Sequence, residues 1–433
     1  MDRDDLEQIV SALVSDPRFM DVLLSNESFL EEVARRISPQ AHDFTIFSYR
    51  DVLIEETVDG EKRLVKPYSD PLATEICEGL SSHFNRTIKP GRMIFDRFGD
   101  RTSLFTADEN IRRKDIYVLF NPDPQKDPDG ELLRFNMFLK TLRSAHARNI
   151  TAVIPELLYS RQDQTNGKRQ IVAARYIADI FDFSGMDHLI TIGLHAPQIE
   201  GFYSSIDHLK TRGVFSDYLQ REALERIKGI ARSEGVVEIG AEFEDGTKFY
   251  REHARLISPD AGGMKGVNEL RRDMDPDRLI DVGFVQKERV GMNQAESGKV
   301  VGDVKGKVVV IYDDMLDTGG SLFGAAKALK EAGALYVIAC VDHFLGNNKS
   351  GEVCFEEKLK NSYIDELVIT NTVPGAYERV TSDDRLKKKT TVLSIAPLLK
   401  EAILRDQSGG TIREMVTQVG KESLYTVLHQ KAA

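Results

Sequence analysis

Short apolar runs and longer amphipathic segments alternate along the chain from about residue 44 to about residue 404. The short runs are rich in β-branched residues and predict buried parallel strands. The longer segments repeat apolar residues at intervals of three or four, which predicts helices. Such alternation indicates parallel sheets covered by helices. The runs predicted as strands are FTIFS, IYVLF, ITAVIPELLY, HLITIGL, ARLISP, LIDVGFVQ, VVVI, LYVIACVDHFL, DELVITNTV and TVLSIA.

The alternation is interrupted after about residue 205 by a charged helix, YLQREALERIKGIARSEG, and by a polar stretch punctuated with glycine. This interruption suggests two similar α/β halves. We expect an N-terminal domain at 43–205, a C-terminal domain at 206–405 and a tail at 406–433. Within the first domain, VLIEETVDGEKRLVKPY predicts a hairpin that turns at Asp59-Gly60.

Residues 1–42 predict a helical extension ahead of the first domain. Pro17 separates two amphipathic stretches, and each has an apolar face. The extension could form an oligomer contact, or it could pack on the body of the protein. The two faces comprise Leu6, Ile9, Val10, Leu13 and Val14, and then Phe29, Leu30, Val33 and Ile37.

Composition limits the class of protein and its partners. The chain has 433 residues, of which 41% are hydrophobic and 29% are charged, as expected of a soluble globular protein with two domains. A net charge of −11 argues against binding to bulk nucleic acid or to an anionic membrane. A small anionic substrate would therefore need a local positive site.

The cysteines and the start of the chain indicate the compartment. Cys77, Cys340 and Cys354 are too few and too scattered for a disulfide framework or a zinc site. The first residues, MDRDDLEQIV, are acidic and lack the apolar core of a signal peptide, and no run approaches membrane-spanning length. The cytoplasm is the expected location.

The segment Val308–Ser321, VVVIYDDMLDTGGS, carries the clearest chemistry. A strand that ends in a Gly/Thr/Ser loop and opens a helix is suited to bind an anion, because backbone N–H groups, hydroxyls and the helix dipole all face it. Carboxylates repel a phosphate, but Asp313 and Asp314 could accept hydrogen bonds from ribose hydroxyls while the loop holds the 5-phosphate. An ordinary strand-to-helix crossover with surface acids is the alternative. The loop residues are Asp317, Thr318, Gly319, Gly320 and Ser321.

This segment closely resembles the motif that binds phosphoribosyl pyrophosphate (PRPP) in the type I phosphoribosyltransferase fold. Other segments resemble the ribose-phosphate diphosphokinase (PRPP synthetase) family, in the family's order. They are ITAVIPELLYSRQD (Ile150–Asp163), DHLITIGLHAPQIEGFY (Asp187–Tyr203), LISPDAGGMK (Leu256–Lys265), IDELVITNTVP and VLSIAPLLKEAI.

The resemblance implies two phosphoribosyltransferase-like domains, each with a parallel sheet flanked by helices, assembled as dimers within hexamers. Residues 43–205 would form the ATP-side domain, and residues 206–405 would carry the ribose 5-phosphate loop. The implied reaction moves the β,γ-pyrophosphoryl group of ATP, with Mg²⁺, to the C1 hydroxyl of ribose 5-phosphate. Its products are PRPP and AMP.

The resemblance also implies roles for individual residues. His195 and Asp260 match the family's metal-site histidine and aspartate, and His195 would also contact ATP. By composition alone, His195 would be read as a core histidine. Lys287 and Arg289 match a catalytic Lys-x-Arg pair on a mobile loop over the triphosphate, although the run QKER would otherwise be read as a solvated charged face.

The adenine side is implied less completely. Arg161 and Gln162 would line the adenine and phosphate side, together with Phe98 and Asp100. The family's Arg-Phe-x-Asp-Gly-Glu is here RFGDRT, without the glutamate, and QTNGKRQ replaces the Lys-rich run that follows Arg-Gln-Asp.

Two further functions remain open at this stage. One is a phosphoribosyltransferase that consumes PRPP, which the histidine segment, the Lys-x-Arg pair and the doubled domain disfavour. The other is a non-catalytic regulatory subunit associated with the synthetase. A silent subunit has no physical need for His195, Asp260, Lys287 and Arg289 together, but the altered adenine segment keeps this alternative open.

Overall fold

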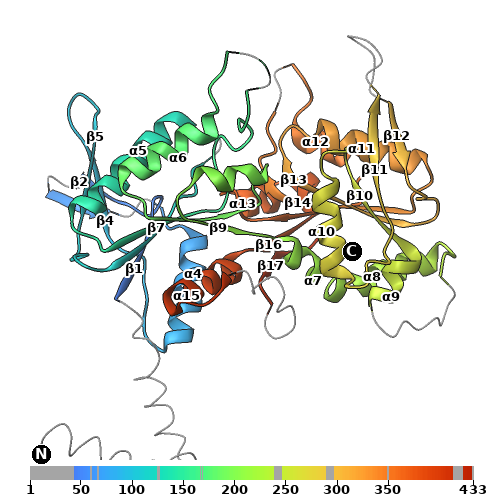
Figure 1. The fold of residues 1–433 in the computed structure, drawn as a ribbon, viewed down its shortest axis with the longest axis horizontal. Coiled ribbons are helices and arrows are strands. Elements are labelled where there is room, and N and C mark those ends of the chain that lie inside the picture. Colours follow the sequence, from blue (N-terminus) through green and yellow to red (C-terminus); the bar gives the residue numbers. More distant parts are fainter. Residues whose placement is uncertain are drawn as a thin grey trace, which may run out of the picture.

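Two α/β domains lie side by side in the computed structural model of the protein (Figure 1). The predicted fold class, parallel sheets flanked by helices, is confirmed. The extension at 1–42 and the parts 413–422 and 432–433 of the tail at 406–433 lie outside the described residues. The structure describes residues 43–58, 61–65, 68–123, 127–165, 167, 169–237, 246–288, 297–348, 351–412 and 423–431.

The N-terminal domain is built on a five-stranded parallel sheet in the order β1-β6-β7-β8-β9. Helices α5 and α6 pack on one face of the sheet, and α4 packs on the other. Asp70 caps α4 by accepting the Leu72 N–H, and Pro71 opens the helix. The elements are β1 (Phe44–Ser48), α4 (Pro71–Phe84), β6 (Asp115–Leu119), α5 (Pro128–Ser144), β7 (Asn149–Ile154), α6 (Ala173–Ser184), β8 (His188–Ile192), the 3₁₀ helix η1 (Pro197–Phe202) and β9 (Ile206–Leu209).

A small sheet in the order β3-β2-β4-β5 lies at the outer end of this domain (Figure 1). Its strands are β2 (Leu53–Val58), β3 (Glu61–Val65), β4 (Met93–Arg97) and β5 (Ser103–Ala107). β2 and β3 pair antiparallel, with Ile54 opposite Val65, as the predicted hairpin requires. The predicted turn at Asp59-Gly60 lies outside the described residues.

The C-terminal domain contains an eight-stranded sheet in the order β12-β11-β10-β13-β14-β15-β16-β17. The six strands from β11 to β16 in this order are parallel, whereas β12 and β17 pair antiparallel at the two edges. The strands are β10 (Ala254–Ser258), β11 (Val282–Glu288), β12 (Ser297–Val301), β13 (Val308–Leu316), β14 (Tyr336–Phe344), β15 (Glu366–Thr370), β16 (Thr390–Ser394) and β17 (Thr426–His429).

Nine helices of the described residues surround or adjoin this sheet. The charged helix predicted as one unit is two, α7 and α8, because the chain turns at Glu222 and Ala223, whose N–H groups both donate to the Tyr218 carbonyl. The turn brings Leu224 and Ile227 into the core. The helices are α7 (Arg212–Arg221), α8 (Leu224–Ser233), α9 (Gly246–His253), α10 (Met264–Met274), α11 (Gly320–Glu331), α12 (Phe355–Lys360), α13 (Ala376–Ser382), α14 (Asp384–Lys387) and α15 (Ala396–Ser408).

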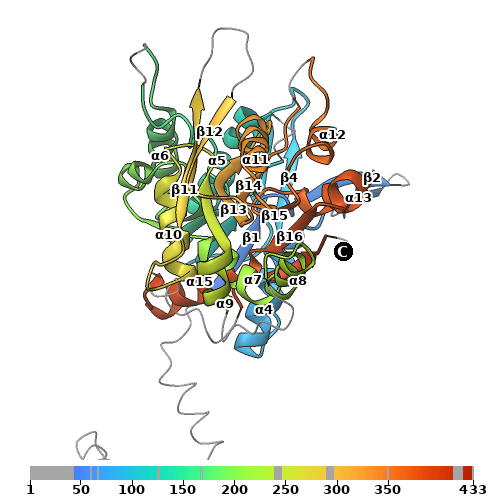
Figure 2. The same ribbon diagram turned by 90° about the vertical axis from the view of Figure 1, so that its right-hand side faces the viewer.

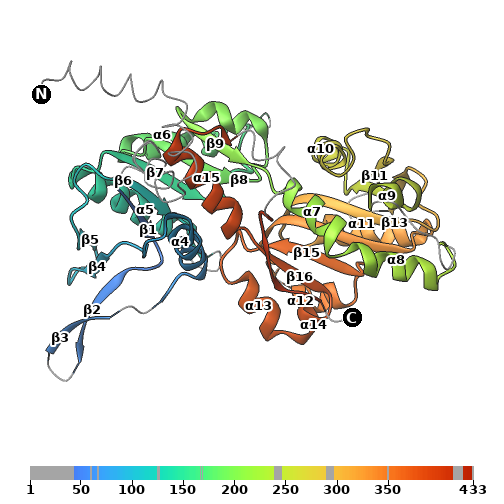
Figure 3. The same ribbon diagram turned by 90° about the horizontal axis from the view of Figure 1, so that it is seen from below.

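The two domains share structure at their junction. Strand β9 follows the predicted boundary at residue 205 but pairs with β8, so the first sheet ends at Leu209. Helix α15 comes from the end of the chain and packs on α4 of the N-terminal domain (Figure 3). Tyr117 OH donates to Asp406 Oδ2 at 2.5 Å, and Ser394 Oγ donates to Glu75 Oε2 at 2.6 Å. One hydrophobic core therefore runs through both domains.

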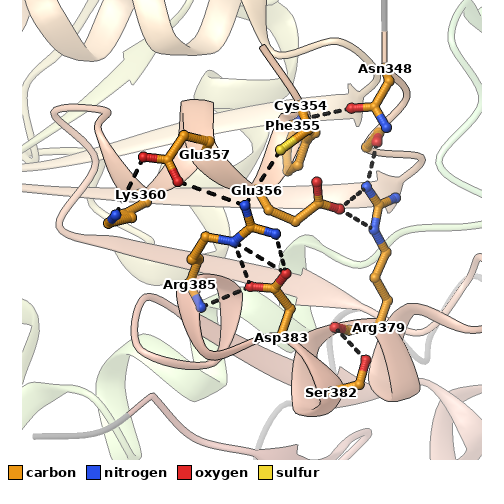
Figure 4. A network of polar contacts seen from close by, with 11 residues as sticks. Asn348, Cys354, Phe355, Glu356, Glu357, Lys360, Arg379, Ser382, Asp383 and Arg385 are labelled. Carbon is orange, nitrogen blue, oxygen red and sulfur yellow. Dashed lines mark hydrogen bonds and ion pairs between the residues drawn. The ribbon is translucent and has the colours of Figure 1, made fainter.

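Helices α12, α13 and α14 are tied together by ion pairs (Figure 4). Arg385 binds Asp383 at 2.5 Å, and Arg379 Nε lies 3.0 Å from Glu356 Oε1. Arg379 also donates to the Leu345 and Gly346 carbonyls at 3.0 and 2.7 Å. The network thus holds the chain where it leaves β14. Across the part of the chain that the structure describes, no helix combines the length and the apolar character needed to cross a bilayer.

Candidate active site between the two domains

The loop after β13 lies at the carboxyl end of the parallel strands, where α/β proteins bind ligands. Strand β13 ends at Leu316 and α11 begins at Gly320, so Asp317, Thr318 and Gly319 make the turn. Gly319 has φ +82°, and a Cβ there would lie 2.2 Å from the Phe323 ring, so this position requires glycine. The short, glycine-dependent turn leaves backbone N–H groups at the start of α11 available to an anion.

Asn347 holds the first residue of this loop, Asp317, through two hydrogen bonds. Its backbone N–H donates to the Asp317 carbonyl at 3.1 Å, and its side-chain amide donates to Asp317 Oδ1 at 2.9 Å. The Leu345 and Gly346 N–H groups both donate to the Leu316 carbonyl. Since Arg379 holds the Leu345 and Gly346 carbonyls, the loop rests on a rigid neighbouring segment.

His195 reaches this loop from the N-terminal domain. It follows β8, and its Nδ1–H donates to Asp314 Oδ2 at 2.7 Å. The Asp314 carboxylate raises the pKa of His195, through the hydrogen bond first, and partial burial opposes this effect. Burial alone would raise the pKa of Asp314, but the hydrogen bond and the charge of His195 lower it overall. Both shifts favour a charged pair that links the two domains.

Arg161 makes a second link between the domains. Its Nη1 lies 2.9 Å from Asp317 Oδ2, although 156 residues separate the two along the chain. Arg161 follows β7, the neighbour of β8, so the carboxyl ends of two adjacent N-terminal strands face the β13 loop. The structure therefore brings Arg161 and His195, from the N-terminal domain, together with Asp314 and Asp317 of the β13 loop.

The acidic residues of the site repel one another. Burial raises the pKa of Asp313 well above its ordinary value, and the charges of Asp314 and Asp260 raise it further. Asp260 lies after β10 and accepts the Gly262 and Gly263 N–H groups at 3.0 and 3.2 Å. Within the described residues, no three His, Cys, Asp or Glu side chains converge closely enough to hold a metal by themselves.

Both halves of the chain match known domains. Residues 64–185 match the N-terminal domain of ribose phosphate pyrophosphokinase, and residues 283–415 match the phosphoribosyl synthetase-associated domain. A ribose-phosphate pyrophosphokinase of Oceanobacillus iheyensis is 31% identical over 334 residues, which cover 76% of this chain and 90% of that protein. The chain belongs to the ribose-phosphate pyrophosphokinase family.

Further relatives agree with this assignment and confirm the family predicted from the sequence. A ribose-phosphate pyrophosphokinase of Aquifex aeolicus is 31% identical over 75% of this chain and 90% of its own length. The crystal structure of phosphoribosylpyrophosphate synthetase from Mycobacterium smegmatis superimposes with a TM-score of 0.64. At 25% identity, that match covers 85% of this chain and all of the M. smegmatis protein.

Lys287, the first residue of the Lys-x-Arg pair predicted to cover the triphosphate, lies on β11. Lys287 is opposite Gly298 in the antiparallel ladder of β11 and β12, and Arg289 lies outside the described residues. The two strands form an arm that extends from the edge of the sheet (Figure 2). The roles of Lys287 and Arg289 stay predictions.

The adenine-side residues are not all gathered at the β13 loop. Phe98 and Asp100 lie in the turn after β4, at the far end of the N-terminal domain from β13 (Figures 1 and 3). Gln162 lines a groove of about 600 Å³ between α5 and α6. Arg161, the residue before Gln162, reaches Asp317. The assignment of Phe98, Asp100 and Gln162 to the adenine side stays a prediction.

Sequence analysis missed several residues that support the site. Asn347 follows β14, which is next to β13, and its position at a parallel strand end was the available signal. His343 at the end of β14 lies 3.2 Å from the Gly193 carbonyl, and no short motif marks it. Such supporting residues can be recognised once the order of the strands in the sheet is known, and the sequence alone does not give that order.

Proposed function

We propose that this chain is an active ribose-phosphate pyrophosphokinase. It transfers the pyrophosphoryl group of MgATP to the C1 hydroxyl of ribose 5-phosphate and releases PRPP and AMP. The observation that carries the proposal is the pair of interdomain contacts, His195–Asp314 and Arg161–Asp317. They join the two segments expected to bind ATP to the loop expected to bind ribose 5-phosphate.

The loop suits a ribose phosphate. Asp313 and Asp314 are partly exposed carboxylates able to accept hydrogen bonds from sugar hydroxyls. Thr318, Gly319, Gly320 and Ser321 supply N–H and hydroxyl donors at the start of α11 for the 5-phosphate. A compact ligand with adjacent hydroxyls and one phosphate uses both parts of the loop.

The opposite side supplies positive charge. Pyrophosphoryl transfer depends on positioning and on neutralising charge over the transferring group and the leaving AMP. Arg161 and His195 face the ribose loop from the N-terminal domain, and Lys287 and Arg289 would approach from the β11 arm. Phe98, Asp100 and Gln162 are proposed for the adenine side.

Magnesium fits the carboxylates of this site. Mg²⁺ prefers oxygen ligands, retains several waters and is commonly held by one or two carboxylates plus phosphates. The mutual repulsion of Asp313, Asp314 and Asp260 is the electrostatic condition that a divalent cation relieves. Asp260 would hold the ion, with His195 beside the metal–triphosphate complex. When bound, the ion would neutralise phosphate charge.

The proposal extends to assembly and location. A homo-oligomer of dimers within hexamers is proposed from the family resemblance, and a cytoplasmic location from the cysteines and the first residues of the chain. Nucleic acid and membranes are not expected partners. A PRPP-consuming phosphoribosyltransferase is less well supported, because the curated relatives cited above are pyrophosphokinases by name and match across both domains. A regulatory subunit remains the second candidate, because of the altered RFGDRT segment.

A direct assay tests the function. Purified protein incubated with MgATP and ribose 5-phosphate should form AMP and PRPP in equal amounts, measured by chromatography. Omitting Mg²⁺ or ribose 5-phosphate should abolish both products. AMP without PRPP would indicate hydrolysis, and formation of neither product would favour the regulatory subunit.

Asp314→Asn and Thr318→Val should weaken the use of ribose 5-phosphate. We expect kcat/KM for this substrate to fall by about 10–100-fold, since a hydrogen bond to a charged group contributes about 1.5–3 kcal/mol. The asparagine keeps an oxygen for His195, so KM for ATP should change less. Asp384→Asn, at an exposed acid on α14, is the matched control. Loss of ATP affinity with an unchanged KM for ribose 5-phosphate would assign the loop to the other substrate.

His195→Ala should leave the protein folded but impair its use of MgATP. The side chain is 42% exposed, so its removal opens no core cavity. We expect kcat/KM for MgATP to fall by about 10²-fold or more, as for one lost charge donor. His188→Ala is the control, because His188 lies on β8, the strand that precedes His195, and binds Ser205 and Asp207. Equal kinetics for the two variants would return His195 to a structural role.

A further inference from the structure

The chain leaves β8 through Gly193, Leu194 and His195, and side chains from both domains hold this short segment. Strands β8 and β9 pair in parallel up to Ile192 opposite Leu209. The Gly193 N–H donates to the Leu209 carbonyl, and the N–H of the next residue, Leu194, points beyond the ladder. It donates to Nε2 of His208 at 2.9 Å, and His208 lies on β9 itself.

His208 is built to accept that hydrogen bond. Its side chain is only 6% exposed, and its Nδ1 lies 2.6 Å from Glu200 Oε1. Burial lowers the pKa of His208 to about 4, and the neighbouring Lys210 ammonium lowers it as well, whereas Glu200 opposes the shift. A neutral imidazole has one donor and one acceptor. With Nδ1–H donating to Glu200, Nε2 is left as the acceptor for the Leu194 N–H, and Lys210 Nζ also lies 3.0 Å from this nitrogen.

The other side of the segment is held from the C-terminal domain. His343 Nε2 lies 3.2 Å from the Gly193 carbonyl, and His343 Nδ1 lies 3.0 Å from Thr372 Oγ1. Gly193 has φ +54°, and a Cβ there would lie 2.7 Å from Asp342 Oδ2. The backbone that carries His195 is thus fixed on both sides before the imidazole reaches Asp314.

We propose that His208 is a positioning residue for the transfer reaction, which holds the Leu194 amide and thereby aims His195 at Asp314 and the metal–triphosphate complex. This inference rests on the proposed function. His208 itself touches no substrate. It acts through one hydrogen bond to the backbone N–H of Leu194, the residue immediately before His195.

The expected loss of activity in a His208 variant follows from the loss of the hydrogen-bond acceptor for the Leu194 N–H. Leu194 is buried at 8% exposure, so an apolar residue at position 208 leaves its N–H without an acceptor. A displacement of His195 by about 1 Å can reduce the rate of a positioned reaction by about 10²-fold. We therefore expect His208→Leu to lower kcat/KM for MgATP by about 10–100-fold, as with other residues that orient a ligand side chain.

The first test is rescue by a matched variant. Glutamine places Oε1 near the position of a histidine Nε2, so His208→Gln should recover most of the activity that His208→Leu loses. Thermal unfolding should be recorded for both. If the leucine variant does not fold, Glu200→Ala serves instead, because Glu200 is 45% exposed and its loss frees the imidazole to rotate. That variant should lower kcat/KM for MgATP by about 3–10-fold, the effect of a weakened neutral hydrogen bond.

The second test is a double-mutant cycle with His195→Ala. If His208 acts through His195, the double variant His195→Ala/His208→Leu should be no slower than His195→Ala alone. The positioning role would be overturned if the two single losses in kcat/KM for MgATP multiplied in the double variant. A His208→Gln variant as slow as His208→Leu would overturn it too. So would wild-type kinetics for His208→Leu. A wild-type protein that forms no PRPP would instead overturn the proposed function, so the two failures are distinguishable.

Discussion

Replacing Lys287 or Arg289 by alanine should lower kcat by about 10²–10⁵-fold, the range observed when a donor that stabilises transition-state charge is removed. Each residue would supply one positive charge over the triphosphate, and the charged run QKER is expected from the sequence to be solvated and not part of the apolar core. The free energy of unfolding should therefore stay close to that of the wild type. Steady-state kinetics and thermal unfolding of both variants measure the two quantities separately.

Lys299→Ala provides the matched control for this pair. Lys299 is an exposed lysine on β12, opposite Gln286 in the same two-stranded arm. Its removal subtracts the same charge from the arm, so long-range electrostatics change equally. Near-wild-type kcat in this control, with large losses at Lys287 and Arg289, would assign the effect to position and not to net charge. Wild-type turnover in both alanine variants would refute the catalytic assignment.

The same experiment separates the enzyme from a regulatory subunit. A non-catalytic subunit would show no turnover before mutation, and its influence on a partner enzyme would not depend on Lys287 and Arg289. An active chain whose turnover depends on both residues accounts for their presence together with His195 and Asp260. The altered RFGDRT segment would then concern adenine recognition alone.

The alternating strands and helices could be predicted because each is a local pattern. A run such as VVVI has few alternatives to a buried strand, and a Gly/Thr/Ser loop after it has a physical reason to bind phosphate. Residues in the Asp313–Ser321 loop are close in sequence, so their grouping was visible at once. Their relation to the fold, at the carboxyl end of a parallel strand, also follows from topology.

Contacts across the domain junction could not be predicted in the same way. Arg161 and Asp317 are 156 residues apart, and only the folded arrangement of two sheets brings them within 2.9 Å. The pairing of β9 with β8 beyond residue 205, and the packing of α15 on α4, depend on a core shared by both domains. The family resemblance indicated His195 and Asp260, but the His208 and His343 contacts that hold the histidine segment follow from geometry alone.

Asp342 shows how this shared junction affects stability. It lies on β14 at 1% exposure, where it accepts hydrogen bonds from the Thr211 hydroxyl and, at 2.9 Å, from Tyr312 OH. Burial raises the pKa of Asp342 from 3.8 to about 7, although these two hydrogen bonds and the charge of Arg212 oppose the shift. The folded protein therefore holds this proton more tightly than the unfolded chain does.

The sign of the pH dependence follows from that difference. Between about pH 4 and pH 7 the folded state binds more protons at Asp342 than the unfolded state, so the free energy of unfolding contributed by this group falls as pH rises. Above about pH 8 both states are ionised and the contribution levels off. The Asp342→Asn variant carries no titratable group at this position, so its free energy of unfolding does not fall with pH for this reason. A pKa difference of about three units, at about 1.36 kcal/mol each, corresponds to at most about 4 kcal/mol.

We expect Asp342→Asn to be more stable than the wild type at pH 8 by about 1–4 kcal/mol, because the asparagine carries no charge to desolvate but must share its amide with two hydroxyl donors. Denaturant unfolding at several values between pH 6 and pH 8.5 measures the effect. The advantage should grow from pH 6 to about pH 8 and then stay constant. Asp384→Asn, an exposed acid, should follow the wild-type curve. Parallel curves for Asp342→Asn and the wild type would mean that Asp342 is ionised in the folded protein throughout this range, stabilised by Arg212 and its two hydroxyl donors.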